Sequence, residues 1–315
     1  MTEIVTRDNF VEAETAHYFR EQLTKAPVNR YFHSRVPVNV ETQVVIRSNV
    51  DLIYSFAVVD VTEEATFSLA PSSEYQVAEI IDENHYVVGV IYPGEILTVR
   101  NADLSTGTHV YVAGRTATGG GLARAHELQD ARRITAATSN PYRGREFDED
   151  TRKSVGAELE THAAEADFSK GFGTPVSTDS YQHLLGARLG WGGLPPEDAQ
   201  YFQAVATSTG VDVWTFAVPP LDYERNGYFS VIKYDGMGWL DVDRPGLSDS
   251  ELVRNDDGTI SIWFGDDRVA NKPNVIRATE GQKFYYGMRL YRPRDAEETR
   301  EFIEKVRSTP IAPVG

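Results

Sequence analysis

The stretch YQVAEIIDENHYVVGVIYPGEILTVR, residues 75–100, contains three short apolar segments separated by turn residues. The segments 75–81, 85–92 and 96–100 are rich in β-branched and aromatic residues, which favour strands. The breaks between them carry Asp, Asn, Pro and Gly, which are typical of turns. Short strands at this spacing predict a β-sandwich or barrel rather than alternating βαβ units.

The flanking sequence extends this strand-rich block in both directions. Residues 43–46, 52–59 and 108–113 have the same β-branched and aromatic character and are predicted as strands. Before them, a helix is predicted over residues 8–23, with Asp8 as its N-cap because a carboxylate can accept a backbone N–H there. The first block therefore combines one helix with a run of short strands.

Two polar helices, predicted over residues 122–137 and 149–166, connect this block to a second one. The second block opens with a helix over 179–189 and another that starts at Pro195, since proline and acidic residues favour a first helical turn. A last helix is predicted to begin at Asp295 with a capping box. The strands between these helices are predicted at residues 211–218, 228–234, 259–264 and 284–291.

These patterns predict a mainly β protein of the α+β class. We expect two β-sandwich or jelly-roll-like domains joined by a helical segment. The predicted boundaries are 1–118 for the first domain, 119–175 for the connecting segment and 176–315 for the second domain.

Composition excludes several classes of function. The chain has 315 residues and no cysteine, which rules out disulfides, thiolate chemistry and zinc sites built on cysteine. A formal net charge of −16 repels phosphate backbones, so we expect no nucleic-acid partner. No apolar run approaches the ~18 residues that cross a bilayer, and the N-terminus lacks the pattern of a signal peptide. We therefore expect a cytoplasmic protein with no membrane partner.

Several segments match the pattern of a known bacterial family in their residues and order. They are FVEAETAHYF (10–19), QVVIR (43–47), ENHY (83–86), HLLG (183–186), GWGG (190–193), AQY (199–201) and RLYRPR (289–294). On these motifs the chain resembles the family that pairs the domains of unknown function 1254 and 1214. The resemblance assigns domain 1254 to residues 1–118 and domain 1214 to residues 176–315, and so covers nearly the whole chain.

This resemblance implies architecture more than chemistry. It implies two β-rich domains with helical insertions, and a homo-oligomer, but no assigned activity or cofactor. The chain departs from the family pattern at Val50, where members often carry Arg, and at Phe229, where they often carry Trp. A third departure is Asn274-Val275, where many members have Asn followed by Cys or Trp.

Arg47, Asp51 and Tyr54 form the strongest cluster of candidate site residues. If the turn at 48–49 joins two strands, Arg47 and Asp51 flank it and can form an ion pair. One interpretation is a structural pair with Tyr54 as a core aromatic residue. The other is an arginine that binds an anion or carboxylate beside an aspartate that acts as general acid or base.

Histidines supply the second group of candidates. His85 follows an acidic turn and is interpreted either as a general base or metal ligand, or as a structural histidine. His183 lies four residues after Asp179, on the same face of the predicted helix. Two ligands do not make a metal site, so we expect neither a metal nor a cofactor.

Aromatic residues and one further arginine complete the candidate site. Tyr86, Trp191 and Tyr201 are expected to line a cleft for a small molecule. Arg289 shares one face of the predicted last strand with Tyr291, because strand side chains alternate. Arg289 is interpreted either as a ligand anchor or as the partner of an acidic residue.

Two functions fit these residues. The first is an enzyme of the hydrolase or lyase type that performs acid/base chemistry on a small organic molecule. In it, Asp51, His85 and Tyr54 are catalytic, and the substrate is bound by Arg47, Tyr86, Trp191, Tyr201 and Arg289. The second is a non-catalytic protein that binds a carbohydrate or another small molecule, because fold alone does not decide function.

Overall fold

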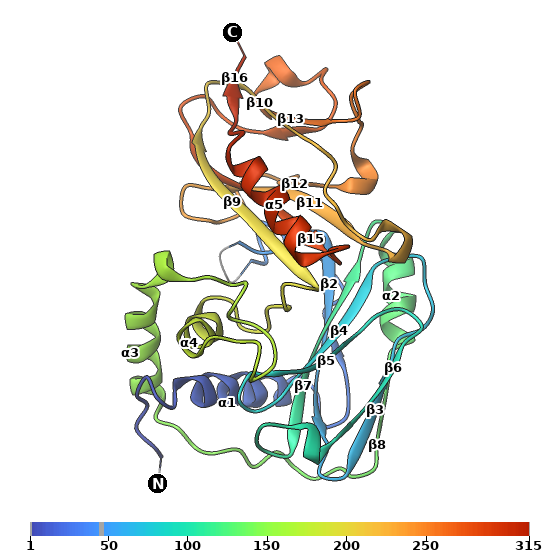
Figure 1. Cartoon of the computed structure of the whole chain (residues 1–315), viewed down its shortest axis with the longest axis vertical. Coiled ribbons are helices and arrows are strands. Elements are labelled where there is room, and N and C mark those ends of the chain that lie inside the picture. Colours follow the sequence, from blue (N-terminus) through green and yellow to red (C-terminus); the bar gives the residue numbers. More distant parts are fainter. Residues whose placement is uncertain (1, 44–46, 315) are drawn as a thin grey trace. The chain divides into compact units, whose positions relative to one another are not determined.

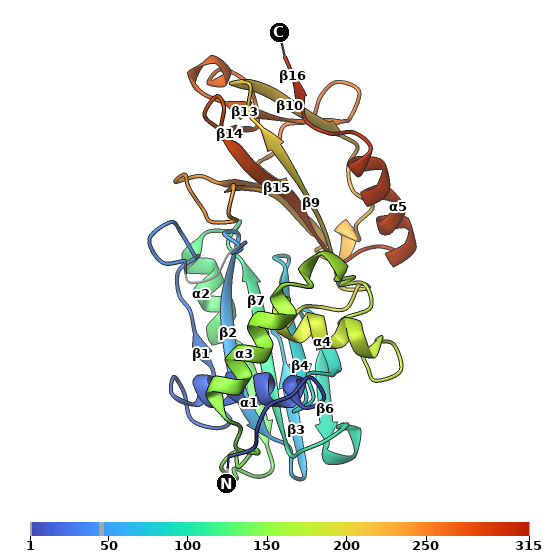
Figure 2. The same ribbon diagram turned by 90° about the vertical axis from the view of Figure 1, so that its left-hand side faces the viewer.

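The computed structural model describes residues 2–43 and 47–314, so positions 44–46 of the predicted strand 43–46 lie outside the described residues. The fold is mainly β and belongs to the α+β class, as predicted, with sixteen strands in four sheets and five α-helices in the described chain. Contacts divide the chain into two compact units (Figures 1 and 2). Unit 1 comprises residues 1–35, 54–117 and 121–196, and unit 2 comprises 36–53, 118–120 and 197–315.

Unit 1 contains a β-sandwich. Its five-stranded sheet has the order β1 (Phe32–His33), β2 (Leu52–Asp60), β7 (His109–Ala117), β4 (Gln76–Ile81) and β5 (Val87–Ile91). Its three-stranded sheet has the order β6 (Ile96–Arg100), β3 (Glu64–Ser68) and β8 (Arg133–Ala136). Alternate residues such as Ala78 and Ile80 pack against Phe67 and Val99 of the smaller sheet. Burial of these apolar faces holds the two sheets together.

Helices cover the other face of the larger sheet. The helices of unit 1 are α1 (Phe10–Leu23), α2 (Leu122–Asp130), α3 (Glu149–Glu160) and α4 (Ser180–Leu189). In both views α1 lies across this sheet (Figures 1 and 2). Phe19 of α1 packs there with Val58, Ile81 and Tyr111.

Unit 2 is built from two four-stranded sheets. One sheet has the order β12 (Gly246–Ser248), β11 (Tyr228–Asp235), β15 (Lys283–Tyr291) and β9 (Ala199–Thr207). The other has the order β14 (Val275–Arg277), β13 (Ile260–Gly265), β10 (Val211–Phe216) and β16 (Ala312–Pro313). Phe202 and Met288 from the first sheet meet Trp214 and Ile262 from the second in one apolar core. The last helix, α5 (Ala296–Arg307), runs beside β9 and adds Phe302 to this core (Figure 1).

Short 3₁₀ turns join several of these elements. They are η1 (Asn101–Asp103), η2 (Ala163–Glu165), η3 (Tyr223–Arg225), η4 (Asp249–Glu251) and η5 (Asp267–Val269). Over residues 2–43 and 47–314, no helix combines the length and apolarity that a bilayer crossing requires.

Helix caps were predicted with mixed success. Asp295 accepts the backbone N–H of Glu298, so this predicted cap is confirmed, and Asp179, predicted as the first residue of its helix, is the N-cap that accepts the N–H groups of Tyr181 and Gln182. The predicted cap Asp8 is wrong, because α1 begins after Asn9. The two acids succeed because each lies in extended backbone directly before its helix.

Two predicted helices are wrong in part or whole. The helix predicted over 122–137 ends at Asp130, and residues 133–136 form strand β8 against β3. Ile134 and Ala136 pack into the sandwich core, so alternation prevailed over helical propensity. Where a helix was predicted from Pro195, the chain instead enters strand β9, whose Phe202 is buried in the core.

Candidate functional site

One face of the sheet β12-β11-β15-β9 carries a row of polar side chains. Ser248 pairs with Ser230, Ser230 pairs with Arg289, and Arg289 pairs with Tyr201 across the four strands. Residues directly opposite one another in a sheet point to the same face. The opposite face of this sheet carries Phe229 and its apolar neighbours and packs into the core. The face with the polar row points away from that core, and Ser230 within it is fully buried.

Tyrosines surround this row on the same face. Strand register places Tyr228 opposite Tyr291 and Tyr234 opposite Tyr285. Each tyrosine is separated by an even number of residues from Ser230 or Arg289 on its own strand, so it points to the same face. The rings of Tyr228 and Tyr291 are stacked with their centroids 4.9 Å apart. We call this surface the tyrosine–arginine face, defined by Tyr201, Tyr228, Ser230, Tyr234, Tyr285, Arg289 and Tyr291.

The segment before β2 is bound to this face by hydrogen bonds. The Tyr234 hydroxyl donates to the Ser48 carbonyl at 3.0 Å, and the Asn49 amide donates to the Tyr291 hydroxyl at 2.8 Å. The Arg289 guanidinium donates to the carbonyl oxygen of Arg47. These bonds fix the backbone that leads to Asp51.

Asp51 is held in place by its own neighbour and lies beside the row. Its backbone N–H donates to the Asn49 side-chain oxygen at 2.7 Å. The Asp51 Oδ2 atom and the Ser230 hydroxyl are both buried. Neither atom forms a hydrogen bond of standard geometry with any described residue. Burial raises the pKa of Asp51 to about 6, and the nearby Ser230 hydroxyl and Arg289 guanidinium oppose that rise. Burial therefore favours the protonated form of Asp51 more than in an exposed aspartate.

A second carboxyl group of the same kind belongs to Asp249. This residue opens the 3₁₀ turn η4 directly after β12. Burial raises its pKa to about 6, and the charge of Asp51 contributes to the rise. The acidic residue whose charge raises the pKa of Asp51 is Glu251. Asp51 and Asp249 are thus two carboxyl groups of unit 2 whose pKa values are raised mainly by burial.

The predicted ion pair between Arg47 and Asp51 is not formed. No carboxylate of the described chain lies within 4 Å of the Arg47 guanidinium, which instead lies 5.5 Å from the centre of the Tyr285 ring. Arg289 lies over the Tyr201 ring at 5.8 Å. The structure thus brings Arg47, Asp51, Tyr201 and Arg289 to one region of unit 2.

The predicted residue Tyr54 lies in unit 1, on β2. Its ring stacks on Phe56 at 5.6 Å. Its carbonyl oxygen accepts hydrogen bonds from the Ser34 backbone and the Gln129 amide, both at 2.9 Å. These contacts connect the strand to the segment before it and to α2.

The other predicted residues, His85, Tyr86 and Trp191, form a stack of rings in unit 1. Tyr18 stacks on Trp191 at 4.3 Å, and Trp191 stacks on His85 at 5.2 Å. His85 lies 5.4 Å from His183, whose ring is nearly parallel to Tyr86 at 4.3 Å. Both ring nitrogens of His183 approach backbone carbonyls, at 3.1 and 2.9 Å. These five rings pack elements distant in sequence against one another.

His85 has an unusual position within this stack. It precedes β5 rather than starting a strand, and its φ of 64° is rare for a residue with a side chain. Its Nε2 accepts the Gly192 backbone N–H at 2.9 Å, while its buried Nδ1 has no partner among the described residues. Burial, followed by the charge of His183, lowers the pKa of His85 well below its usual range. The folded protein therefore holds this ring neutral.

We expect His85 to make the protein less stable in mild acid. A histidine whose pKa falls on folding contributes stability above its unfolded pKa, and this stability is lost as pH falls below about 6.5. Between about pH 7.5 and pH 5.5, the free energy of unfolding of the wild type should fall by ~1.4 kcal/mol more than that of the variant His85→Asn. Asparagine is chosen because it tolerates the positive φ of this position. Urea unfolding at both pH values measures the difference. The control is His162→Asn, which changes a partly exposed histidine outside the ring stack. A pH dependence of unfolding in His85→Asn equal to that of the wild type would contradict the expectation.

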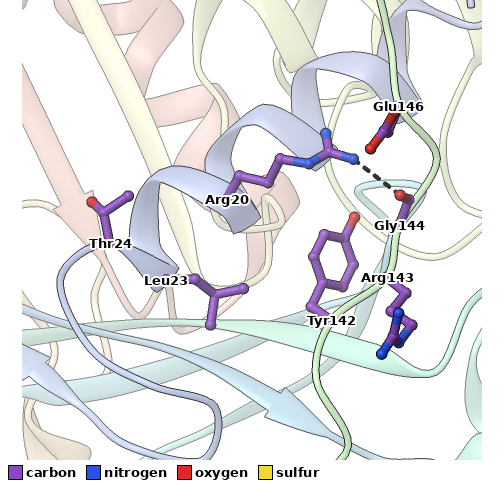
Figure 3. A pocket seen from close by; sticks show the side chains of 7 residues that line it. All are labelled: Arg20, Leu23, Thr24, Tyr142, Arg143, Gly144 and Glu146. Atoms are coloured by element: carbon purple, nitrogen blue, oxygen red, sulfur yellow. Dashed lines mark hydrogen bonds between the residues drawn. The ribbon is translucent and has the colours of Figure 1, made fainter. Parts of the chain in front are cut away.

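A separate pocket of about 500 Å³ opens on unit 1 between α1 and the segment before α3 (Figure 3). It is lined by Arg20, Leu23, Thr24, Tyr142, Arg143, Gly144 and Glu146. The Arg20 guanidinium donates to the Gly144 carbonyl at 3.0 Å, and Arg143 points away from it (Figure 3). Glu146 is the one carboxylate in the lining, so the pocket offers no acid/base pair. Within residues 2–43 and 47–314, no group of three metal-ligating side chains is found.

Asp249 and Ser230 were missed as site residues. Asp249 is one of 47 acidic residues, and no local pattern distinguishes it. Ser230 lies within the predicted strand 228–234, where nothing marks it out. Its place opposite Ser248 and Arg289 depends on strand register, and a single sequence does not reveal register between distant strands.

Comparisons with known proteins support the fold alone. No family model matches the chain, and no curated protein matches it. The crystal structure of the VPA0106 protein from Vibrio parahaemolyticus is similar, with a TM-score of 0.71 and 17% identity over 98% of this chain and 97% of that one. A putative uncharacterized protein from Burkholderia cenocepacia has a TM-score of 0.51 and 12% identity, over 91% of this chain and 85% of that one.

Proposed function

We propose that the chain is an enzyme that performs acid/base chemistry, hydrolysis or elimination, on a small organic molecule at the tyrosine–arginine face. The observation that supports this proposal is the presence of two carboxyl groups, Asp51 and Asp249, whose pKa values burial raises to about 6, with the charge of Asp51 contributing at Asp249. Pairs of ionisable groups with shifted pKa values are concentrated at catalytic sites, because catalysis needs groups that exchange protons near the working pH.

Each group on the face has a role in this proposal. The ionised carboxylate of the pair removes a proton from the substrate or from an attacking water. The protonated member returns a proton to the leaving group. Arg289 holds a negatively charged group of the substrate, and the half-buried rings of Tyr201 and Tyr285 pack against its apolar part.

A non-catalytic binding protein for a carbohydrate or another small molecule is the second candidate. Partly exposed tyrosines on one sheet face, with Arg289 against Tyr201, favour it. Aromatic rings can bind sugar or planar ligands without any proton transfer. The two candidates differ in whether the Asp51 carboxyl is needed for turnover or contributes at most to binding.

The wider setting of this activity is also a proposal. We infer that the chain pairs the domains of unknown function 1254 and 1214, on the motifs that it shares with that family. We further infer a cytoplasmic homo-oligomer with a small-molecule ligand. Its net charge of −16 disfavours nucleic acid as a partner.

An activity screen that needs no knowledge of the substrate tests the proposal. One arm offers p-nitrophenyl esters and glycosides, and the other follows hydrogen–deuterium exchange at carbon in mixed hydroxy and keto acids by NMR. We expect turnover with a bell-shaped pH profile centred near pH 6, because the base must be ionised and the acid protonated. A rate that does not change between about pH 5 and 7 would exclude this carboxyl pair from the mechanism.

A further inference from the structure

A buried arginine in unit 1 has no acidic partner. Arg132 is 3% exposed, and its guanidinium donates to the carbonyls of Val77 at 3.2 Å and Arg115 at 2.7 Å. It also donates to the Thr116 hydroxyl at 2.9 Å. Its Nε has no partner, and no described carboxylate lies within 4 Å of it. In a chain with 47 acidic residues, the hydrogen bonds described for this guanidinium all go to neutral acceptors.

The sheet is shaped to accept this guanidinium. A Cβ atom on Gly114 would lie 2.7 Å from the Arg132 Nη1 and 2.9 Å from the Ser55 carbonyl. Contacts this close do not occur for real Cβ atoms, and the Ser55 carbonyl is backbone that cannot turn aside. Glycine at this position therefore lets the charged group lie flat against the strands.

A glutamine without partners faces the same interior. Gln76 is 0% exposed, and neither its amide nitrogen nor its amide oxygen makes a hydrogen bond with any described residue. Gln76 pairs directly with Thr116 across β4 and β7, so both side chains lie on one face of the sheet. Arg132 bonds to that same Thr116 hydroxyl. The unused donors of Arg132 and Gln76 thus belong to one buried region, which we call the Arg132–Gln76 cluster.

The side chains with the largest electrostatic influence on Arg132 are Tyr31, Tyr75 and Arg115, none of which is a carboxylate. Burial, together with the charges of Arg35 and Arg132, lowers the pKa of His33 to about 4, so its ring is neutral at pH 7. Burial raises the pKa of Tyr31, which keeps its hydroxyl protonated. The Arg132 charge is therefore uncompensated by the residues that surround it, and burying an unpaired charge is costly.

We propose that the Arg132–Gln76 cluster binds a small monovalent anion, a halide or a short carboxylate. The Nε–H of Arg132 and the amide N–H₂ of Gln76 are the donors that receive it, in charge-assisted hydrogen bonds. Arg132 and Gln76 are 3% and 0% exposed, so the proposal is limited to small anions.

Thermal unfolding of the whole chain in different anions tests this proposal. Chloride, bromide, formate and acetate are each titrated at constant ionic strength against sodium gluconate, whose anion is too large for the cluster. We expect a saturable rise of the unfolding midpoint, about 5–10 °C, for at least one small anion. Equal midpoints in all five anions would overturn the proposal.

Two variants and one control test whether the stabilisation by anions arises at the Arg132–Gln76 cluster. Arg132→Met should abolish the anion response, whereas Arg124→Met, an exposed arginine paired with Glu74 and Glu127, should retain it. If Arg132→Met does not fold, Gln76→Met is used in its place. Its apparent affinity for the anion is expected to be at least tenfold weaker than that of the wild type. An anion response that survives in the folded Arg132→Met variant would overturn the site.

Bromide distinguishes the two sources of anion. In crystals soaked in bromide, an anomalous peak beside the Arg132 Nε would identify a halide site. Formate density at that place, with no bromide peak, would identify a carboxylate site. Peaks confined to the protein surface, in both soaks, would overturn the proposal.

Discussion

Replacing Asp51 with asparagine is expected to lower turnover by ~10²–10⁴-fold while leaving the protein folded. Asparagine has nearly the same shape as aspartate, but it can neither take up nor release a proton near pH 6. The backbone N–H of Asp51 still bonds to Asn49, so the segment keeps its anchor. The rate constant at saturating substrate, measured at the optimum pH of the wild type, gives the size of the loss.

Stability separates a catalytic role for Asp51 from a structural one. Folding raises the pKa of Asp51 from 3.8 to about 6, so the folded state disfavours the ionised form. Above pH 6 this group therefore destabilises the protein, and Asp51→Asn should stabilise it by ~1–2 kcal/mol at pH 7. Below about pH 4 the stabilisation should vanish, because the group is then protonated in both states. A variant that is inactive and also less stable at pH 7 would indicate a structural role.

Neighbouring variants refine the same expectation. Asp249→Asn should also lose turnover, since it removes the second member of the pair, whereas the exposed Asp243→Asn should match the wild type. The Ser230 hydroxyl lowers the pKa of Asp51, so Ser230→Ala should move the acidic limb of the pH profile upward. If neither the wild type nor any variant shows turnover, and Asp51→Asn still binds the ligand, the result would favour the non-catalytic binding function.

Strand alternation made most of the fold predictable. The stretch around residues 75–100 forms β4, β5 and β6 close to the predicted limits, because its apolar residues fill both faces of a sandwich. Predictions failed where a short segment supports two structures. Residues 133–136 are arginine, isoleucine, threonine and alanine, and pairing with β3 decided their conformation. Such long-range pairing outweighs the weak local preference of four residues.

The candidate site was predictable only in its local parts. Arg289 and Tyr291 were placed correctly on one strand face, because alternation is a local property. The electrostatic influence of Asp51 on Asp249 was not predictable, since nearly two hundred residues separate them and Asp249 follows β12, whose pairing with β11 is long-range. His85 was noticed for its chemistry, whereas its place in a ring stack depends on α4 and the loop at Trp191.

Replacing Glu14 with glutamine is expected to lower the free energy of unfolding of unit 1 by ~2–4 kcal/mol. Glu14 is 2% exposed, and its carboxylate binds Arg152 of α3 and Arg188 of α4, the latter at 3.1 Å. Removing the charge leaves two guanidinium groups without their buried partner. Urea unfolding followed by circular dichroism measures the loss.

Glu12 on the same helix provides a matched control. Its carboxylate pairs with Arg145, but both side chains are substantially exposed, so Glu12→Gln should cost ~0–1 kcal/mol. The loss at Glu14 should stay below that of a fully orphaned charge, because Arg152 keeps Glu149 and Arg188 keeps Glu160. Equal losses in the two variants would mean that the cost of burying Glu14 cancels its attraction to the arginines. A larger loss at Glu14 would establish that this ion cluster, beside the apolar cluster of Phe10, Leu159 and Leu185, stabilises the packing of α1, α3 and α4.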